Sequence, residues 1–478
     1  MNTDAPWPTL EEAEVRVLEI QTKLHQWAMI GPDRQFKDLY NLVYDPAVLL
    51  VAWHRVRGNR GARSAGVDGV QPRKIAPGWG LFLFRLHLEL KDRTFQPVPV
   101  RERMIPKANG KLRGLGIPTA RDRTVQAALK LILEPVFEAD FKPCSYGFRP
   151  RRRAMDAITE IHQMVSRSYE WVFEGDIKAC FDEIDHPALM DRIRRRIGDK
   201  RVLALVKAFL KAGVLTEAGV RRNTNTGAPQ GGILSPLLAN IALSVLDEHF
   251  SKAWAYFSRY NGSRLYRRRR GLPTYKLIRY ADDFVVVLTG TREHAEALRE
   301  EVADVLATMG LRLSEEKTTV VHIDEGFEFL GFRIQRQTKQ GTVNRRYVYV
   351  WPSKKALATA KAKVRTITSQ GTNKPLADLL RQLNPVLRGW SNYFRHGNSK
   401  ATFSYLHQFT WRRIIGWLRR KHRRANWKQL RRRYLPRWWP TDGADTLFDT
   451  RKVPVTRYYY RGTKIPAPWR QPMTIRTT

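Results

Sequence analysis

Two adjacent aspartates, Asp282 and Asp283, stand between two apolar runs in residues 277–288, Leu-Ile-Arg-Tyr-Ala-Asp-Asp-Phe-Val-Val-Val-Leu. Apolar and β-branched residues on both sides of a short polar break predict two strands joined by a tight turn. An ordinary turn also explains the break, because Asp is favoured in turns. Two neighbouring carboxylates beside buried strands are costly, however, unless a cation binds there. The stretch therefore predicts a β-hairpin and leaves the chemistry of its two acids open.

The charge of the chain restricts its partner. Its 478 residues, 42% of them hydrophobic, suffice for roughly two or three domains. Lys and Arg number 85 against 45 Asp and Glu, a net charge of +40, which on a folded chain favours nucleic acid over an anionic membrane surface.

No apolar run reaches the ~20 residues of a spanning helix, and the N-terminus lacks a signal-peptide pattern. Cys144 and Cys180 have no CxxC partners, which excludes a Cys-rich zinc module and fits a reducing cytoplasm.

The N-terminal part of the chain is predicted to be helical and then basic. Apolar residues at helical spacing predict two helices in residues 9–56, with a break near Gly31-Pro32. A Gly-rich loop at residues 57–72 follows and carries several arginines, among them Arg57, Arg60 and Arg63. Glycines let a backbone approach a phosphate closely, but a flexible linker has the same composition. Both interpretations of this loop stay open.

A hairpin is predicted at residues 99–118, which alternate in the strand manner around the turn signal Asn109-Gly110. Lys107 and Arg113 lie six positions apart across this turn. A hairpin with a two-residue loop can bring both cations to one face, where they could hold a triphosphate. A solvated basic hairpin is the alternative.

A third carboxylate, Asp176, follows an apolar strand that ends at Gly175. A carboxylate at the end of a buried strand is a usual place for a metal ligand. Three nearby acids are expected at the surface or as helix caps, namely Asp182, Glu183 and Asp185. Together with Asp282 and Asp283, Asp176 makes the set of carboxylates that two-metal phosphoryl transfer requires.

Several other stretches have a predicted structure. Residues 121–138 and 291–309 have helical spacing, and a further helix follows the stretch Ser145 to Pro150. A Pro-Gln-Gly-Gly loop opens an apolar helix in residues 226–243 and puts Gln230 near the helix N-terminus, although a simple helix start is the alternative. Residues 310–318 are predicted to form a strand and turn with Lys317, and residues 327–332 an aromatic strand.

Beyond about residue 352 the pattern becomes helical and basic. Steps of 3 and 4 define one apolar face with Leu380, Leu383, Leu387, Trp390 and Phe394, and a later one with Ile414, Trp417 and Leu418. Arginines repeat by seven on other faces, at Arg381, Arg388 and Arg395, and at Arg412, Arg413, Arg419 and Arg420. Such helices can pack on a core and grip a phosphate backbone, with solvated faces as the alternative. The tail from residue 421 interleaves basic and aromatic residues, which favours nucleic acid through stacking.

The order of these parts resembles the reverse transcriptases encoded by group II introns, the intron maturases, over roughly residues 50–420. The resemblance rests on Tyr280-Ala281-Asp282-Asp283, Asp176 with Phe181, Gly227 to Gly232, Ser145 to Pro150 and Phe329 to Phe332. It implies an α+β right-hand polymerase, with fingers and a palm whose antiparallel sheet is backed by helices, followed by a helical thumb or maturase domain. The implied divisions are a helical extension with a template-contacting loop at 1–72, fingers and palm at 73–335, thumb or domain X at 336–425, and a basic aromatic tail, as a DNA-binding region, at 426–478.

The same resemblance implies an RNA-directed DNA polymerase that also binds intron RNA and promotes its splicing and mobility. Asp176, Asp282 and Asp283 would bind two Mg²⁺ ions, assisted by the Ile177 carbonyl. Roles at the nucleotide would fall to Lys107 and Arg113 as triphosphate grips, Gln230 as a further contact, Phe181 as a gate against a 2′-hydroxyl, and Lys317 as the proton donor to pyrophosphate. The RNA-binding residues would be Arg57, Arg60, Arg63, Arg381, Arg388, Arg395, Arg412 and Arg413.

Expected partners are intron RNA, target DNA with its primer, and dNTPs, with no membrane. The expected location is the bacterial cytoplasm, with the nucleoid as the site when DNA is bound, and both a monomer and a homodimer stay open. Many relatives have Pro where this chain has Gly114, and some end in a Cys/His-rich endonuclease domain, which the cysteines here do not support. We therefore expect no cleavage of the second DNA strand.

Two other functions compete with this one. An RNA-binding splicing cofactor without polymerase activity would not be expected to keep the acid triad, Phe181 and Gln230 intact. A domesticated reverse transcriptase, of the retron, diversity-generating or CRISPR-associated kind, usually lacks the helices predicted at 380–420.

Overall fold

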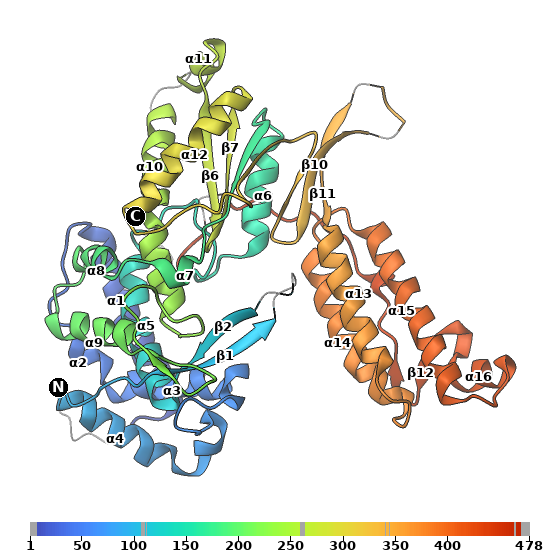
Figure 1. Ribbon diagram of the computed structural model, residues 1–478, viewed down its shortest axis with the longest axis horizontal. Helices are drawn as coiled ribbons and strands as arrows, with labels where there is room; N and C mark the ends of the chain where they lie inside the picture. Colours follow the sequence, from blue (N-terminus) through green and yellow to red (C-terminus); the bar gives the residue numbers. More distant parts are fainter. Residues whose placement is uncertain are drawn as a thin grey trace, which may run out of the picture. The chain divides into compact units, whose positions relative to one another are not determined.

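The computed structural model describes residues 7–106, 110, 112–258, 263–339, 341–343, 345–462 and 465–469. The chain is an α+β protein that divides into two compact units (Figure 1). The first unit holds residues 1–153, 173–320 and 462–478, and the second holds residues 154–172 and 321–461. In the described part of the chain, no helix combines the length and the apolar character needed to cross a membrane.

The N-terminal helices form a bundle in the first unit. Helices α1 (Leu10–Ile30), α3 (Pro46–Gly58) and α5 (Ala120–Glu138) pack on one another, with the short α2 (Tyr40–Val43) between the first two in sequence. The two helices predicted in residues 9–56 are therefore confirmed, and α1 ends at the predicted break because Gly31 caps it. Near the other end of the chain, the buried Trp469 donates to Gln21 of α1 over 3.2 Å.

The basic loop at residues 57–72 is anchored to the bundle. It contains the 3₁₀ turn η1 (Arg60–Arg63) and leads through η2 (Pro72–Gly78) into α4 (Trp79–Lys91). The buried Arg123 of α5 donates to the carbonyls of Gly61 (2.7 Å) and Ser64 (2.9 Å). A Cβ atom on Gly66 would lie 2.7 Å from the Thr119 nitrogen, so glycine is needed here for contact with protein backbone.

The hairpin predicted at residues 99–118 is confirmed as β1 (Val100–Pro106) and β2 (Leu112–Ile117). These strands belong to a sheet of order β2-β1-β4-β5, completed by β4 (Val214–Leu215) and β5 (Arg221–Arg222). The two hairpin strands are antiparallel, with Ile105 opposite Arg113 and a last pair of Pro106 and Leu112. Lys107 and Asn109 lie outside the described residues.

The second sheet of the first unit has the order β6-β7-β3-β8. Its strands are β3 (Trp171–Gly175), β6 (Thr274–Tyr280), β7 (Asp283–Thr289) and β8 (Thr319–His322). The predicted hairpin at 277–288 is confirmed, since β6 and β7 are antiparallel and end in a pair of Tyr280 and Asp283. Helix α10 (Ser235–Ser258) packs on β6 and on α12 (Arg292–Ala307), which confirms the helix predicted at 291–309. This apolar cover explains why residues 284–288 are buried.

Short helices complete the first unit. They are α7 (Cys180–Glu183), α8 (His186–Arg194), α9 (Lys200–Lys211) and α11 (Ser263–Arg269). Asp185 is the N-cap of α8 and accepts from the Ala188 nitrogen over 2.8 Å, as expected for one of the acids after Asp176.

Three local predictions were wrong. Residues 310–318 form no strand; Leu313 makes only an isolated bridge to Ile177, and a turn follows. The aromatic stretch at 327–332 is split into β9 (Phe327–Phe329) and the start of β10 (Phe332–Thr338), because Leu330 and Gly331 both have positive φ and reverse the chain. The apolar helix begins only at Ser235, so Gln230 lies in the loop before it.

The second unit combines a small sheet with a helical part. Strands β9, β10 and β11 (Arg346–Pro352) form a sheet of order β11-β10-β9, and His162 of α6 (Ala154–Val165) lies 3.2 Å from the Val348 carbonyl oxygen of β11. The helical part consists of α13 (Lys354–Ser369), α14 (Leu376–Phe394), α15 (Lys400–Lys421) and α16 (Trp427–Tyr434). Four short elements follow, η3 (Pro436–Trp438), β12 (Thr441–Asp442), β13 (Asp445–Thr446) and η4 (Thr450–Lys452).

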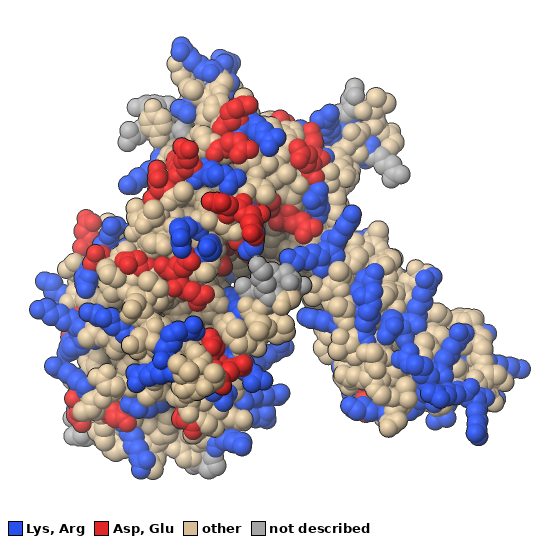
Figure 2. Space-filling view, in the orientation of Figure 1, with Lys and Arg blue, Asp and Glu red and all other residues tan. Residues whose placement is uncertain are grey.

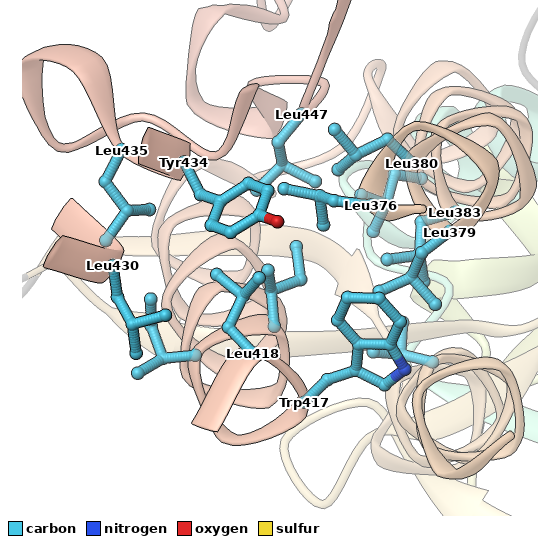
Figure 3. Close-up of a cluster of buried hydrophobic side chains, with 14 of the residues drawn as sticks. Leu376, Leu379, Leu380, Leu383, Trp417, Leu418, Leu430, Tyr434, Leu435 and Leu447 are labelled. Atoms are coloured by element: carbon cyan, nitrogen blue, oxygen red, sulfur yellow. The ribbon is translucent and has the colours of Figure 1, made fainter. Parts of the chain in front are cut away.

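The apolar faces predicted beyond residue 352 meet in one core. Leu380 and Leu383 of α14 pack with Trp417 and Leu418 of α15, all at most 1% exposed (Figure 3). Leu387 and Ile414 belong to the same cluster. This packing confirms the predicted inward faces of both helices. Burial of large apolar side chains is the main term that holds such helices together.

The tail makes contacts that the sequence did not predict. Tyr458 and Arg461 both bind Asp156 of α6, and Tyr460 donates to Glu160 over 2.5 Å. These two acids are buried and lie about three hundred positions earlier in the chain. The tail from residue 441 to Arg461 is therefore packed as part of the second unit.

Candidate active site

The end of the β6–β7–β3 sheet brings the predicted acids together. Strand β3 ends at Gly175, next to the start of β7, and a Cβ atom on Gly175 would lie 2.1 Å from Cζ of Phe284. Glycine is thus required for the Phe284 ring to pack across β3. Because Asp176 follows Gly175 and Asp283 precedes Phe284, all three predicted carboxylates stand at the same end of the sheet.

The Asp282 turn is a tight two-residue connection. Tyr280 and Asp283 are paired, so Ala281 and Asp282 occupy the turn itself. Ala281 has a φ of 59°, in the left-handed region that non-glycine residues rarely adopt. Asp282 is half-buried and Asp283 is exposed. The backbone therefore presents two carboxylates at the strand ends, one of them partly shielded from water.

Lys317 also reaches this place. Its Nζ atom lies 2.7 Å from Oδ2 of Asp176. The contact follows from the bridge between Ile177 and Leu313, and from the bond of the Ser314 nitrogen to the Asp176 carbonyl at 2.7 Å. The turn after Leu313 thus brings an ammonium group to the first predicted metal ligand.

A metal-binding geometry is not formed by these side chains themselves. Among the residues that the structure describes, no three His, Cys, Asp or Glu side chains lie close enough to hold a metal ion. The chemistry of the set still suits Mg²⁺, since Mg²⁺ prefers carboxylate oxygens and binds through one or two carboxylates together with substrate phosphates. The described geometry neither adds nor removes a ligand from the predicted set.

The Pro-Gln-Gly loop packs on the helix that carries Phe181. The Ala228 nitrogen donates to the Phe181 carbonyl over 2.6 Å, and Gly227 has a φ of 82°. A Cβ atom on Gly227 would lie 2.6 Å from the carbonyl oxygens of Phe181 and Asp182, so only glycine fits. Phe181 is 7% exposed. Its position is thus fixed by the loop that also carries Gln230.

The same loop also contacts the β1–β2 hairpin. The Gly116 nitrogen of β2 donates to the Gln230 carbonyl over 2.7 Å, and Nε of Arg113 donates to Oε1 of Gln230 over 2.5 Å. Two of the predicted nucleotide-binding residues are therefore in direct contact. Lys107, the other predicted triphosphate ligand, lies outside the described residues.

The predicted RNA-binding arginines differ in their surroundings. Arg57, Arg60, Arg63, Arg381, Arg388 and Arg412 are exposed. Three of the predicted residues also have protein partners: Arg381 binds Asp445 (3.0 Å) and Asp378 (3.4 Å), Arg388 stacks on Phe448, and Arg413 donates to Thr368. Arg395 is half-buried, with its Nε atom buried and unbonded among the described residues. The main acidic partner of Arg381, Asp445, comes from a distant strand.

The helical part of the second unit is nevertheless strongly basic. Between residues 352 and 440, Asp378 is the single acid against 22 Lys and Arg residues. Figure 2 shows Lys and Arg side chains over α13–α16, with Asp and Glu sparse on that face. A surface of this kind attracts a phosphate backbone.

Arg279 is a residue whose importance the sequence reasoning missed. It lies in β6 just before the turn, and its side chain is 0% exposed and paired with Asp247 of α10. The available signal was an arginine that directly follows the apolar pair Leu277-Ile278 at the end of the strand, since charged residues are almost never fully buried unless paired.

Both cysteines are expected to be unreactive in the folded protein. Burial raises the pKa of Cys144 to about 12, reinforced by Asp247, and burial raises that of Cys180 to about 12, reinforced by Asp282. Since the thiolate is the reactive form, iodoacetamide at pH 8 should modify neither residue, and both should react after unfolding in guanidinium. Mass spectrometry after timed quenching measures this, and rapid labelling of the native protein would contradict the burial.

Comparisons with known proteins agree with this arrangement. Residues 105–334 match the family "Reverse transcriptase (RNA-dependent DNA polymerase)", and residues 357–435 match "Group II intron, maturase-specific domain". Protein YkfC of Escherichia coli is 38% identical over 359 residues, which cover 71% of this chain and 93% of YkfC.

Two intron-encoded relatives are longer than the matched part. The group II intron-encoded protein LtrA of Lactococcus lactis is 34% identical over 401 residues, 73% of this chain and 63% of LtrA. A COX1/OXI3 intron 1 protein of Saccharomyces cerevisiae is 26% identical over 408 residues, 75% of this chain and 46% of that protein. The chain thus spans less than two thirds of both intron-encoded relatives. With a reverse transcriptase domain followed by a maturase-specific domain, the chain belongs to the family of reverse transcriptases and maturases encoded by group II introns.

Proposed function

We propose that this protein copies RNA into DNA by two-metal nucleotidyl transfer, and that it binds the RNA of a group II intron and supports its splicing and mobility. The observation that carries the polymerase is that Asp176 and the Asp282 turn lie at the same end of one sheet, and the contact of Arg113 with Gln230 adds support. Two Mg²⁺ ions, when bound, would activate the primer 3′-hydroxyl and stabilise charge on the transferred phosphate. Asp176, Asp282 and Asp283, with the Ile177 carbonyl, would hold them.

The remaining residues act on the nucleotide. The planar guanidinium of Arg113 can donate several hydrogen bonds at once, which suits a triphosphate, and Lys107 would add a second cation. Gln230 holds Arg113 and would contact the same nucleotide. Lys317, next to Asp176, would give its proton to pyrophosphate as it leaves.

RNA binding is proposed for the basic helices and for the loop at residues 57–72. Its main support is the near absence of acids between residues 352 and 440. The exposed Arg57, Arg60, Arg63 and Arg412 would contact phosphates directly, as would Arg381 and Arg388, which are also exposed. The half-buried Arg395 and Arg413 would contribute positive potential.

Primer extension tests the polymerase. Purified protein, an RNA template, an annealed DNA primer, dNTPs and Mg²⁺ should yield full-length cDNA, and EDTA should stop the reaction. A protein that binds and splices its intron RNA but makes no cDNA would instead be a splicing cofactor. Intron RNA structure in the genome around the gene separates the maturase from retron-type or CRISPR-associated enzymes.

Phe181→Ala should admit ribonucleotides. If the Phe181 ring excludes the 2′-hydroxyl, its removal should reduce the preference for dNTP over rNTP by roughly tenfold to several hundredfold, as for other steric contacts. Steady-state kcat/KM for dCTP and CTP on the same template measures the ratio. Phe181→Leu, which keeps bulk, is the matched control, and unchanged discrimination in Phe181→Ala would remove the gate.

A further inference from the structure

The charged pair behind the Asp282 turn is completely buried. Arg279 and Asp247 both have side chains that are 0% exposed. Nε of Arg279 lies 2.8 Å from Oδ1 of Asp247, and Nη2 lies 2.5 Å from Oδ2. A pair with this geometry is bidentate and fixes the plane of the guanidinium.

All five N–H donors of Arg279 have an acceptor. Two go to Asp247, one to Oδ1 of Asn240 (3.0 Å), one to Oγ of Ser145 (2.8 Å), and one to the carbonyl oxygen of Ala281 (2.8 Å). The last bond is made to the turn itself, at the residue before Asp282. Ala281 has a φ of 59°, and such a conformation persists only where the surroundings hold it.

The segment that includes the stretch Ser145 to Pro150 also contacts Arg279. Cys144 and Tyr146 exchange backbone hydrogen bonds with Arg279, at 2.9 and 2.8 Å. This pairing brings Gly147 against the turn, where a Cβ atom would lie 2.2 Å from the Ala281 nitrogen. Nδ2 of Asn240 in turn donates to the Gly147 carbonyl over 2.9 Å.

We propose that Arg279 is a positioning residue for polymerisation, and that Arg279, Asp247, Asn240, Ser145 and Gly147 form an anchor that fixes the Asp282 turn. Stability alone does not require this pair, because apolar residues of similar volume often replace a buried ion pair without loss. The planar guanidinium instead fixes geometry, because it donates to the Asp247 carboxylate of α10 and to the Ala281 carbonyl of the turn at the same time. The anchor also gives a role to the Ser145 to Pro150 stretch, and the proposal rests on the proposed polymerase function.

Arg279→Lys tests the anchor. Lysine keeps the charge but has three donors around one atom, so it cannot span Asp247 and Ala281 in the same way. The single-turnover rate of nucleotide addition per active site should fall on the order of tenfold to hundredfold, as for small misplacements of catalytic groups, and the Mg²⁺ concentration for half-maximal rate should rise. Primer-template binding should stay at the wild-type level. Arg192→Lys is the matched control, since Arg192 binds α10 at Ile241 and Ser244 without touching the turn.

Gly147→Ala tests the contact between Gly147 and the Asp282 turn by adding one methyl group. Gly147 does not have a positive φ, so alanine tolerates its conformation, and the expected effect comes from the Ala281 contact alone. We expect the same fall in rate and the same Mg²⁺ shift. Gly80→Ala in α4 is the control, because a Cβ atom there meets no atom within 4 Å.

The outcomes are distinguishable by titrating active sites with primer-template before each measurement. Fewer active sites with an unchanged rate and Mg²⁺ dependence per site would mean a structural role and would overturn the proposal. Wild-type kinetics in both variants would overturn it as well. If the wild-type protein itself makes no cDNA, the proposed function fails, and the anchor fails with it.

Discussion

Asp282→Ala is expected to abolish cDNA synthesis while intron RNA is still bound at the wild-type level. Asp282 lies in the turn that Arg279 holds, half-buried at the end of the β6–β7 hairpin. Removing a carboxylate from a catalytic unit typically lowers the rate on the order of 10⁴-fold. The turn should keep its fold, because it is held by the pairing of Tyr280 with Asp283 and by the bond of Arg279 to the Ala281 carbonyl. Neither contact involves the Asp282 side chain. Single-turnover primer extension measures the loss, and filter binding measures RNA affinity.

Two further variants make this result specific. Asp282→Asn keeps the side-chain shape without the charge and should be nearly as inactive, since a cation site depends on the charge. Asp304→Ala removes an exposed carboxylate from α12 and should extend primers like the wild type. Substantial synthesis by Asp282→Ala would contradict the assignment of this turn as a metal site.

Trp417→Ala should remove much of the stability of the helical part of the second unit. Trp417 is 1% exposed and packs among leucines of α14 and α15 (Figure 3). Replacing a fully buried tryptophan by alanine costs about 3–5 kcal/mol, because it leaves a large cavity. A denaturant titration followed by circular dichroism measures the shift of the midpoint. Splicing assisted by the protein should fall with it, since the basic helices lose their common core.

The controls for Trp417 lie in the same helix. Tyr405→Ala removes an aromatic residue that is 47% exposed and should cost less than about 1 kcal/mol. Trp417→Phe keeps most of the bulk and also removes a buried indole N–H that has no partner among the described residues, so its cost should be smaller than that of alanine. Equal costs for Trp417→Ala and Tyr405→Ala would show that the core does not depend on this side chain.

Local patterns in the sequence predicted the elements that depend on near neighbours. The β6–β7 hairpin is marked by apolar, β-branched runs on both sides of a polar break, and the helices α14 and α15 by apolar residues at steps of 3 and 4. These elements were found as expected. The acids Asp176 and Asp282 could be placed at strand ends for the same reason. A turn such as Leu330-Gly331 could not be found, because Leu330 adopts a positive φ that its type rarely takes.

Pairs distant in sequence carry no such pattern. Arg279 meets Asp247 after 32 positions, and Arg381 meets Asp445 after 64. An arginine stripe on a helix looks the same in sequence whether it faces solvent, RNA or an acid from another element. Only the fold shows that the exposed Arg381 is paired with Asp445.

The separation between α6 and its partners affects how the protein is made. Asp156 is joined to Arg461 across 305 positions. At a synthesis rate of about 5–20 residues per second, the ribosome needs on the order of 15 to 60 s between the two. During that interval residues 173–320 of the first unit are made, whereas Asp156 and Glu160 still lack the tail that covers them. The second unit is therefore completed only when residues up to Arg461 have left the ribosome, and nascent chains stalled before Tyr458 should hold α6 without its contacts to Tyr458, Tyr460 and Arg461.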